Sequence, residues 1–179
     1  MALDELVARI ASIAVTQHGL VRTDQVAPGE RVGVRHLARR GHLVRVAKGV
    51  YGIAGAPVTW EQRLTAAAWA LGRDAVVSHM SAARLWGYEH FADDALEVPV
   101  PRRQRGRAVD GLGVTVHSAL RLPRGDVRSH SGLRVTSPER TIVDLARAGT
   151  AERRLEAAVD SALRLRLTTL ERVIDRASA

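Results

Sequence analysis

The amino-acid sequence predicts an α+β protein in which several helices enclose a few short strands. Apolar residues recur at helical spacing through most of the chain, and short β-branched or alternating runs interrupt them. Gly and Pro stand between these runs, as expected for connecting turns. Hydrophobic residues make up 46% of the chain but aromatic residues only 3%, so we expect an aliphatic core. A chain of 179 residues allows one large domain or two small ones.

The first part of the chain, residues 1–55, begins with two predicted helices. Apolar residues at helical spacing predict a helix over residues 3–16; they are Leu3, Leu6, Val7, Ile10 and Ile13. A short helix is expected to start at Thr23, whose hydroxyl can cap the free backbone N–H groups of a first turn. Pro28 and Gly29 would end that helix and form a tight turn.

The next predicted helix is basic on one side and apolar on the other. Arginines spaced by four residues share one side of a helix, and a histidine and a fourth arginine lie beside them. These residues are Arg31, Arg35, His36, Arg39 and Arg40. The opposite side carries Val34, Leu37 and Ala38 at core spacing. Gly41 is expected to end the helix.

Two short runs after this helix predict a β-hairpin with a basic tip. Residues 43–46 and 50–53 are strand-like, and Ala47-Lys48-Gly49 joins them. The hairpin adds Arg45 and Lys48 to the cations of the preceding helix. The preceding segment, residues 19–21, would pair with the hairpin as a third strand.

Helix, turn, basic helix and basic hairpin in this order are typical of a winged helix-turn-helix. Such a fold places the basic helix in a DNA major groove and the hairpin on the flanking backbone. The alternative is an arginine-rich helix side that is merely solvated. The cations cluster on the helix that follows a tight turn and on the next hairpin, and this clustering favours DNA binding.

The charge of the chain also points to a polyanionic partner. The net charge is +8, and residues 1–55 hold eight Lys or Arg against four Asp or Glu. Acidic membrane lipid is the rival partner, but no apolar run of 18 residues predicts a transmembrane helix. Asp4 and Glu5 stand where a signal peptide would need basic residues, and cysteine is absent, so we expect a cytoplasmic protein.

The second part, residues 56–179, is predicted to be a mixed α/β domain with short strands and several helices. A linker at residues 54–57 precedes it. Thr59 and Gln62 fit a capping box that opens a helix to Leu71, and Ser137, or Thr136 with Glu139, would open another. Strands are expected at residues 75–77, 96–100, 114–117 and 133–135, and further helices at residues 79–86, 140–148, 151–166 and from Thr168 onward.

An arginine-rich stretch in the second part has two interpretations. Residues 102–134 contain eight Arg and two Asp. This excess suits either a second phosphate-contacting arm or a mobile, solvated hairpin tip. The four arginines that would form this arm are Arg102, Arg103, Arg105 and Arg107.

No residue pattern supports catalysis, a metal site or a cofactor, and we expect no enzyme. Lys48 is the only lysine, so lysine-dependent phosphate loops and nuclease sites are disfavoured, and the seven histidines are scattered. Ser78 and His79 are adjacent at a strand-to-helix junction, where neighbouring side chains point apart, so helix capping is favoured over a catalytic pair. Asp144 and Asp160 are expected either to lie at the plain surface or to pair with Arg140 and Arg164, four residues away.

Three motifs together resemble the AbiEi family of antitoxins from type IV toxin–antitoxin systems. They are HGLVRTDQV with RHLARRGHLVRVAKGVYGI, then AVVSHMSAARLWG, then GLRVTSPERTIVDLA. The resemblance implies a DNA-binding repressor of its own operon that recognises inverted repeats in the promoter. It also implies that the protein counters a nucleotidyltransferase-type toxin without forming a stable complex with it.

The resemblance further implies which residues contact DNA. They are Arg31, Arg35, His36, Arg39 and Arg40 on the helix, Arg45 and Lys48 on the hairpin, and Arg102, Arg103, Arg105 and Arg107 in the second domain. An alternative is a DNA-targeting module whose nuclease domain is missing or supplied by a partner. The absence of an acid-plus-lysine cluster favours the antitoxin and repressor.

Overall fold

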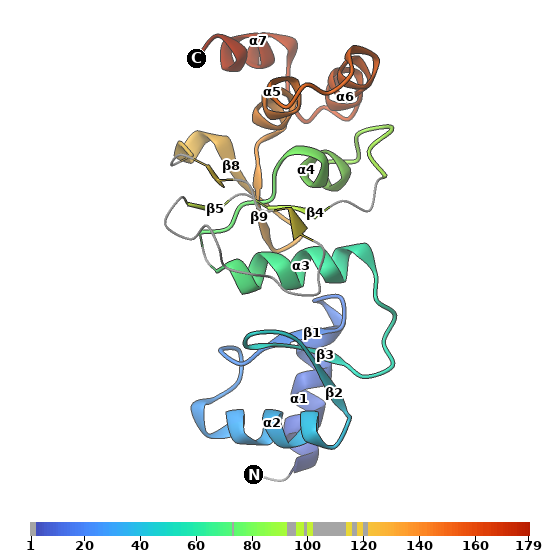
Figure 1. The fold of residues 1–179 in the computed structure, drawn as a ribbon, viewed down its shortest axis with the longest axis vertical. Helices are drawn as coiled ribbons and strands as arrows, with labels where there is room; N and C mark the ends of the chain where they lie inside the picture. Colours follow the sequence, from blue (N-terminus) through green and yellow to red (C-terminus); the bar gives the residue numbers. More distant parts are fainter. Residues whose placement is uncertain are drawn as a thin grey trace. The chain divides into compact units, whose positions relative to one another are not determined.

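The computed structural model describes residues 3–72, 74–92, 96–98, 100–101, 114–115, 118–119 and 122–179 (Figure 1). These residues form an α+β fold with seven α-helices and several small sheets, which confirms the predicted α+β class, whereas the winged helix-turn-helix stays a prediction. The chain divides into two compact units, one ending at Gly72 and the other built from the described residues beyond it. The predicted domain boundary at residue 55 stays a prediction.

The N-terminal unit wraps four helical elements around one small antiparallel sheet. Its elements are α1 (Leu3–Val15), β1 (Leu20–Arg22), η1 (Pro28–Glu30), α2 (Arg31–Arg39), β2 (Leu43–Ala47), β3 (Val50–Ile53) and α3 (Trp60–Leu71). The strands lie in the order β1-β3-β2, so the segment after α1 pairs with the hairpin as predicted from the sequence.

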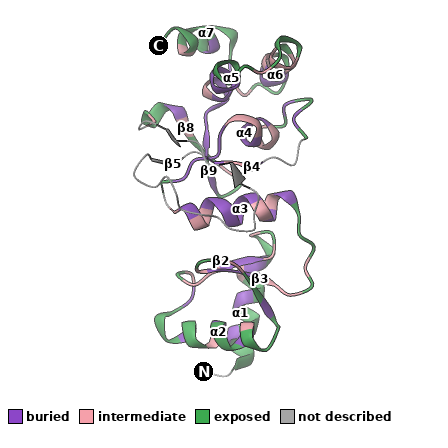
Figure 2. Ribbon diagram, viewed as in Figure 1, coloured by how far each residue is buried: buried purple, intermediate pink, exposed green. Residues whose placement is uncertain are grey.

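One side of α2 belongs to the core of this unit. Val34 is 1% exposed and Leu37 is 3% exposed, and both pack with α1 and the sheet. The other side of the helix is exposed, and the exposed residues of α2 are coloured green on its ribbon in Figure 2. Gly33 marks the closest approach to α1, because an ideal Cβ there would overlap Cδ2 of Leu6. Burial of the apolar stripe therefore fixes which side of α2 faces solvent.

The helix expected from Thr23 does not exist, and this prediction was wrong. The backbone N–H of Thr23 donates to the carbonyl of Gly49 at 3.0 Å, so Thr23 continues the pairing of β1 with β3. The side chain of Gln25 then accepts a hydrogen bond from the N–H of Arg22 at 2.8 Å. These contacts use Thr23 and its neighbours in a turn, and only the 3₁₀ turn η1 precedes α2.

Gly41 ends α2 as predicted. It has a φ of +80°, a left-handed conformation that glycine adopts without steric cost. Its N–H donates to the carbonyl of Ala38 at 3.1 Å, and the N–H of His42 donates to that of Leu37 at 3.0 Å. This paired arrangement satisfies helix-end carbonyls and turns the chain directly into β2.

The C-terminal unit surrounds short strand pairs with four helices in its described part. Its elements are α4 (His79–Leu85), β4 (Leu96–Glu97), β5 (Val100–Pro101), β6 (Val114–Thr115), β7 (Ser118–Ala119), η3 (Arg124–Asp126), β8 (Val127–His130), β9 (Leu133–Thr136), α5 (Pro138–Arg147), α6 (Glu152–Arg164) and α7 (Leu170–Ser178). β4 pairs with β6 and β5 with β7 in parallel, whereas β8 and β9 form an antiparallel hairpin. The strand expected at residues 75–77 is only a single bridge from Val77 to Val135.

Buried aromatic side chains connect the helices of this unit to its strands. Tyr88 and Phe91 lie in a core shared by all four helices. The indole N–H of Trp86 donates to the carbonyl of Thr136 at 2.9 Å. The hydroxyl of Tyr88 donates to the carbonyl of Pro138 at 3.1 Å, and burial, with the nearby charge of Glu139, raises the pKa of Tyr88 well above its usual value. The start of α5 is thus held by two aromatic hydrogen bonds.

The predicted starts of α3, α5 and α7 were correct to within two residues, but their caps differ in detail. Ser137 caps α5 by accepting from the N–H of Arg140 at 3.3 Å, which decides between the two predicted alternatives. Thr59 caps α3, whereas the side chain of Gln62 donates to the carbonyl of His18 instead of completing a capping box. Thr169 rather than its predecessor caps α7.

Replacing Gly33 by Ala should destabilise the protein. In an exposed helix this change stabilises by about 1 kcal/mol, but here the new methyl overlaps the buried side chain of Leu6. Overpacking of this kind costs about 1–3 kcal/mol, measurable as a lower urea midpoint. Gly29→Ala is the matched control, because a Cβ at that position would meet nothing within 4 Å. Equal midpoints for both variants would show that α1 and α2 do not pack this closely.

Candidate nucleic-acid interface

Seven predicted DNA-contacting residues of the N-terminal unit are exposed or partly exposed. We call them the basic set: Arg31, Arg35, His36, Arg39 and Arg40 of α2 and its C-terminal end, and Arg45 and Lys48 of the β2–β3 hairpin. The helix residues lie away from Val34 and Leu37, which are buried. The structure therefore presents these cations to solvent rather than folding them into the core.

The acidic residues of the N-terminal unit do not neutralise the basic set. Glu30 is 6% exposed, pairs with Arg9 at 3.1 Å and accepts a hydrogen bond from the N–H of Ala27 at 2.8 Å. Asp24 pairs with Arg22 at 3.1 Å. No member of the basic set forms an ion pair with an acidic residue in the described part of the chain. Their charges remain available to an external anion.

One hydrogen bond fixes the start of α2 relative to the hairpin tip. Nε of Arg31 donates to the carbonyl of Thr23 at 3.2 Å. The N–H of Thr23 in turn donates to the carbonyl of Gly49, which follows Lys48 in the hairpin turn. Since Arg31 is held through Nε, its two terminal nitrogens remain for another acceptor. Arg31 and the hairpin tip are thus coupled through Thr23.

The hairpin itself is short. Gly49 has a φ of +75°, as a tight turn requires, and Arg45 lies opposite Tyr51 in the ladder. A bulge between Arg45 and Ala47 interrupts the register. Such a bulge increases the local twist of the strand that carries these cations.

The arginines predicted as a second DNA-contacting arm cannot be placed. They lie outside the described residues and are Arg102, Arg103, Arg105 and Arg107.

The buried acidic residues described in the C-terminal unit, by contrast, are paired with arginines. Asp126 is 5% exposed and accepts hydrogen bonds from Arg140, at 2.9 Å, and from Arg176. Arg140 also pairs with Asp144 at 2.7 Å, which confirms the predicted i,i+4 pair. Burial lowers the pKa of Arg140, but the two carboxylates outweigh that effect and raise it overall. The group remains charged, as a buried ion-pair network requires.

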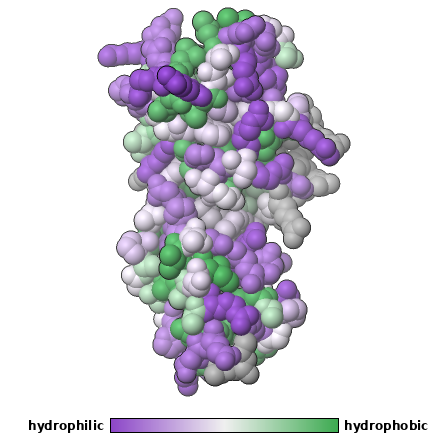
Figure 3. Space-filling model, turned by 180° about the vertical axis from the view of Figure 1, so that it is seen from behind, coloured by the Kyte–Doolittle hydropathy of each residue, from purple (hydrophilic) through white to green (hydrophobic). Residues whose placement is uncertain are grey.

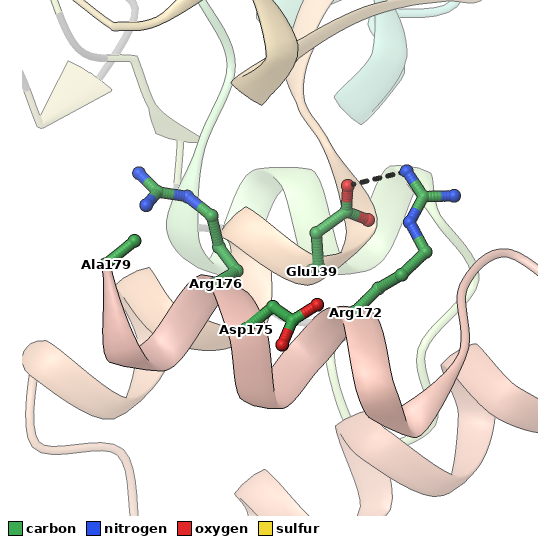
Figure 4. Close-up of a pocket in the computed structure, with 5 residues that line it drawn as sticks. All are labelled: Glu139, Arg172, Asp175, Arg176 and Ala179. Atoms are coloured by element: carbon green, nitrogen blue, oxygen red, sulfur yellow. Dashed lines mark hydrogen bonds and ion pairs between the residues drawn. The ribbon is translucent and has the colours of Figure 1, made fainter.

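A shallow pocket lies beside this network, between the start of α5 and α7 (Figure 4). Glu139 accepts a hydrogen bond from Arg172 at 3.3 Å, shown as the dashed line, and Arg128 approaches it at 3.8 Å. The remaining lining residues are Asp175, Arg176 and Ala179. Its strongest charges are already paired, so we assign it a structural role in holding α7.

The terminal helix α7 depends on these ion pairs. Val173 is its one buried residue among those described, whereas Leu170 and Ile174 are 53% and 55% exposed. Figure 3 shows hydrophobic atoms at the surface where α6 and α7 lie, at the top of that view. Arg172 and Arg176 therefore add ion pairs to the apolar contact that Val173 makes with the core of the unit.

The interpretation of Ser78 as a helix cap was wrong. Its hydroxyl lies 2.5 Å from Nδ1 of His79, which has a φ of +50°, and it makes no capping hydrogen bond. The carboxylate of Glu97 caps α4 instead, because it accepts a hydrogen bond from the backbone N–H of Met80 at 2.7 Å. Ser78 is 1% exposed and His79 is partly exposed, and the two side chains contact each other rather than pointing apart as the sequence led us to expect.

Of the two alternatives predicted for Asp160, the structure shows the exposed surface position. Arg164 pairs with Glu89 at 2.6 Å and not with Asp160. Among the described residues, no group of three or more His, Cys, Asp or Glu could hold a metal ion. Of the helices described, none has the length and apolar character needed to cross a membrane.

Sequence reasoning missed the roles of Asp126 and Glu97. Asp126 is 14 residues from Arg140 and 50 from Arg176, and Glu97 is 17 from Met80. No periodic spacing reveals such partners, because the fold alone brings them together.

The geometry defines a two-unit α+β protein with a solvent-facing basic set in one unit and an internally paired charge network in the other. The family model of the AbiEi antitoxin C-terminal domain matches residues 75–178, more than half of the chain. The chain therefore belongs to the AbiEi family of antitoxins, which act in toxin–antitoxin systems. A search of curated proteins finds no match.

Replacing Asp126 by Asn should destabilise the C-terminal unit and loosen α7. The substitution leaves Arg140 and Arg176 partly buried without one of their carboxylates, and breaking a buried pair costs about 3 kcal/mol. Thermal unfolding and hydrogen exchange of α7 amides would measure the effect. Asp160→Asn, at an exposed position of α6, is the control and should change stability by less than about 0.5 kcal/mol. Unchanged exchange in α7 would contradict its ion-pair attachment.

Proposed function

We propose that this antitoxin binds double-stranded DNA through a winged helix in its N-terminal unit and represses its own operon. The observation that carries the proposal is the basic set, whose seven solvent-facing side chains find no acidic partner in the described part of the chain. Unpaired surface cations on one helix and the adjoining hairpin are the electrostatic pattern of a DNA-binding domain.

The order of elements supports a winged-helix assignment. α1, β1, η1, α2 and the β2–β3 hairpin follow one another, and β1 completes a three-stranded sheet with the hairpin. In this assignment η1 replaces the second helix of a helix-turn-helix, and α2 is the recognition helix. The hairpin, the wing, carries Arg45 and Lys48.

The dimensions of α2 suit a major groove. A helix of nine residues is about 13 Å long, and a major groove about 12 Å wide admits one helix. We assign Arg35 and Arg39 to base edges, since one bidentate contact with guanine discriminates by about 1–3 kcal/mol. Arg45 and Lys48 are assigned to phosphates, which add affinity without sequence preference. The operator would consist of inverted repeats in the promoter.

Membership in the antitoxin family supports a second half of the proposal. The protein would counter a nucleotidyltransferase-type toxin encoded by a neighbouring gene, without a stable complex. The matched domain, residues 75–178, does not include the basic set, so we assign repression and toxin neutralisation to separate units.

The proposal is tested by titrating the full chain against its own promoter duplex and a scrambled duplex at two salt concentrations. Tight, promoter-selective binding that weakens with salt is expected, because neutralised phosphates release counterions. Equal and weak binding to both duplexes would reject the repressor function.

Two substitutions should separate base reading from phosphate contact. Arg35→Ala should lower promoter affinity by about tenfold or more while leaving scrambled DNA nearly unaffected. Lys48→Ala should weaken both duplexes alike and reduce the slope of log K against log salt by about one unit. If both variants changed the two duplexes in the same proportion, α2 would not be the recognition helix.

Toxin neutralisation should survive loss of DNA binding. The double variant Arg35→Ala/Arg39→Ala changes only solvent-facing residues and should still restore growth when co-expressed with the neighbouring toxin from an unrelated promoter. Asp126→Asn, which loosens the matched domain, is the contrasting variant and should rescue poorly. Loss of rescue in the DNA-binding variant alone would place the antitoxin activity in the N-terminal unit.

A further inference from the structure

An exposed valine stands among the cations of α2. Val32 is the second residue of the helix and is 63% exposed, whereas Val34 two positions later is 1% exposed. The N-terminal unit thus buries one valine of α2 fully and leaves the other in solvent.

Val32 shares its side of the helix with the residues proposed to read DNA. Successive residues of an α-helix are rotated by about 100°, so positions 35, 36 and 39 lie within about 60° of position 32. Arg35 and His36 are its neighbours at i+3 and i+4. Around the helix axis, the side chain of Val32 therefore lies between those of Arg35 and His36, on the side of α2 that carries the basic set.

Nothing within the folded unit requires valine at this position. The buried cluster that contains Val34 and Leu37 does not include Val32. Valine is also a weaker helix former than alanine or arginine. A binding role therefore accounts better for this residue than packing or helix propensity.

We propose that Val32 is a specificity-determining residue that contacts the C5 methyl group of a thymine in the operator. The inference rests on the proposed DNA-binding function. The thymine methyl is the one apolar group that the standard bases present in the major groove, and apolar side chains recognise it. Val32 lies in the first turn of α2, and the N-terminal residues of a recognition helix are those that reach base edges.

The position of Val32 also constrains the sequence that it reads. Arg35, one helical turn further on, is the residue assigned to guanine. Since the two side chains are neighbours on the helix, the thymine contacted by Val32 lies within a step or two of that guanine. Each half of an inverted repeat would contain the same thymine and guanine at the same spacing.

The test removes apolar groups from either side of the contact, namely the one thymine methyl from the DNA or the two methyl groups of Val32 from the protein. Each thymine of the promoter duplex is replaced in turn by deoxyuridine, which differs only by that methyl. The wild-type chain should lose about three- to fivefold in affinity at one thymine per half-site, the factor expected for one buried methyl group. Val32→Ala should show the same loss on the unmodified duplex and no further loss with deoxyuridine at that position.

Two controls keep the result interpretable. Val15→Ala removes an exposed valine of α1, which carries no member of the basic set, and should keep the full deoxyuridine effect. Thermal unfolding of Val32→Ala should match the wild type or exceed it, since alanine favours helix. Cytosine and 5-methylcytosine at the same position provide a further pair, and only the methylated base should restore part of the wild-type affinity.

The outcomes distinguish this inference from the function on which it rests. Promoter-selective binding with no thymine whose methyl couples to Val32 would overturn the inference and leave the repressor function standing. Failure to prefer the promoter over scrambled DNA would reject the repressor function itself. Coupling at one thymine per half-site would establish Val32 as a base-reading residue.

Discussion

The packing of α2 against α1 is the constraint on which the candidate interface depends. Val34 and Leu37 are buried in the core, and the absence of a side chain at Gly33 lets Leu6 approach the helix closely. With this side fixed, the opposite side of α2 and its C-terminal end face solvent, and five positions there are basic. The hydrogen bond from Arg31 to Thr23 then sets the helix start relative to the hairpin turn. Tertiary packing, rather than helix propensity alone, therefore fixes where the basic side chains of α2 lie.

The two units use arginine in opposite ways. In the N-terminal unit the basic set faces solvent and is unpaired with the described acidic residues, so its charge acts outward. In the C-terminal unit Arg140 and Arg176 share the buried carboxylate of Asp126, so their charge holds elements together. Composition alone does not separate these uses, because every arginine adds one positive charge to the net charge of +8, whether it is paired or exposed.

Local features of the fold were predictable from the sequence, and features that depend on distant partners were not. The amphipathic spacing of α2, its end at Gly41 and the hairpin are set by residues within a few positions of one another, and all three were predicted correctly. The helix expected at Thr23 failed because Thr23 bonds to Gly49, 26 residues away. The role of Asp126 depends on residues up to 50 positions distant. The exposed basic residues were found from spacing, whereas the exposure of Val32 becomes evident only in the structure.

Charge and shape contribute differently to a DNA-binding surface. On the proposed interface, the six arginine and lysine side chains of the basic set would give affinity for any duplex, because phosphates are the same at every step. A repressor also needs groups whose contacts change when one base pair changes, and a methyl-sized apolar group is sensitive to a single thymine. Exposing such an apolar side chain to water in the unbound protein costs little free energy, since isolated apolar side chains are common on protein surfaces. An aliphatic side chain held among arginines therefore adds selectivity where a further cation would add only affinity.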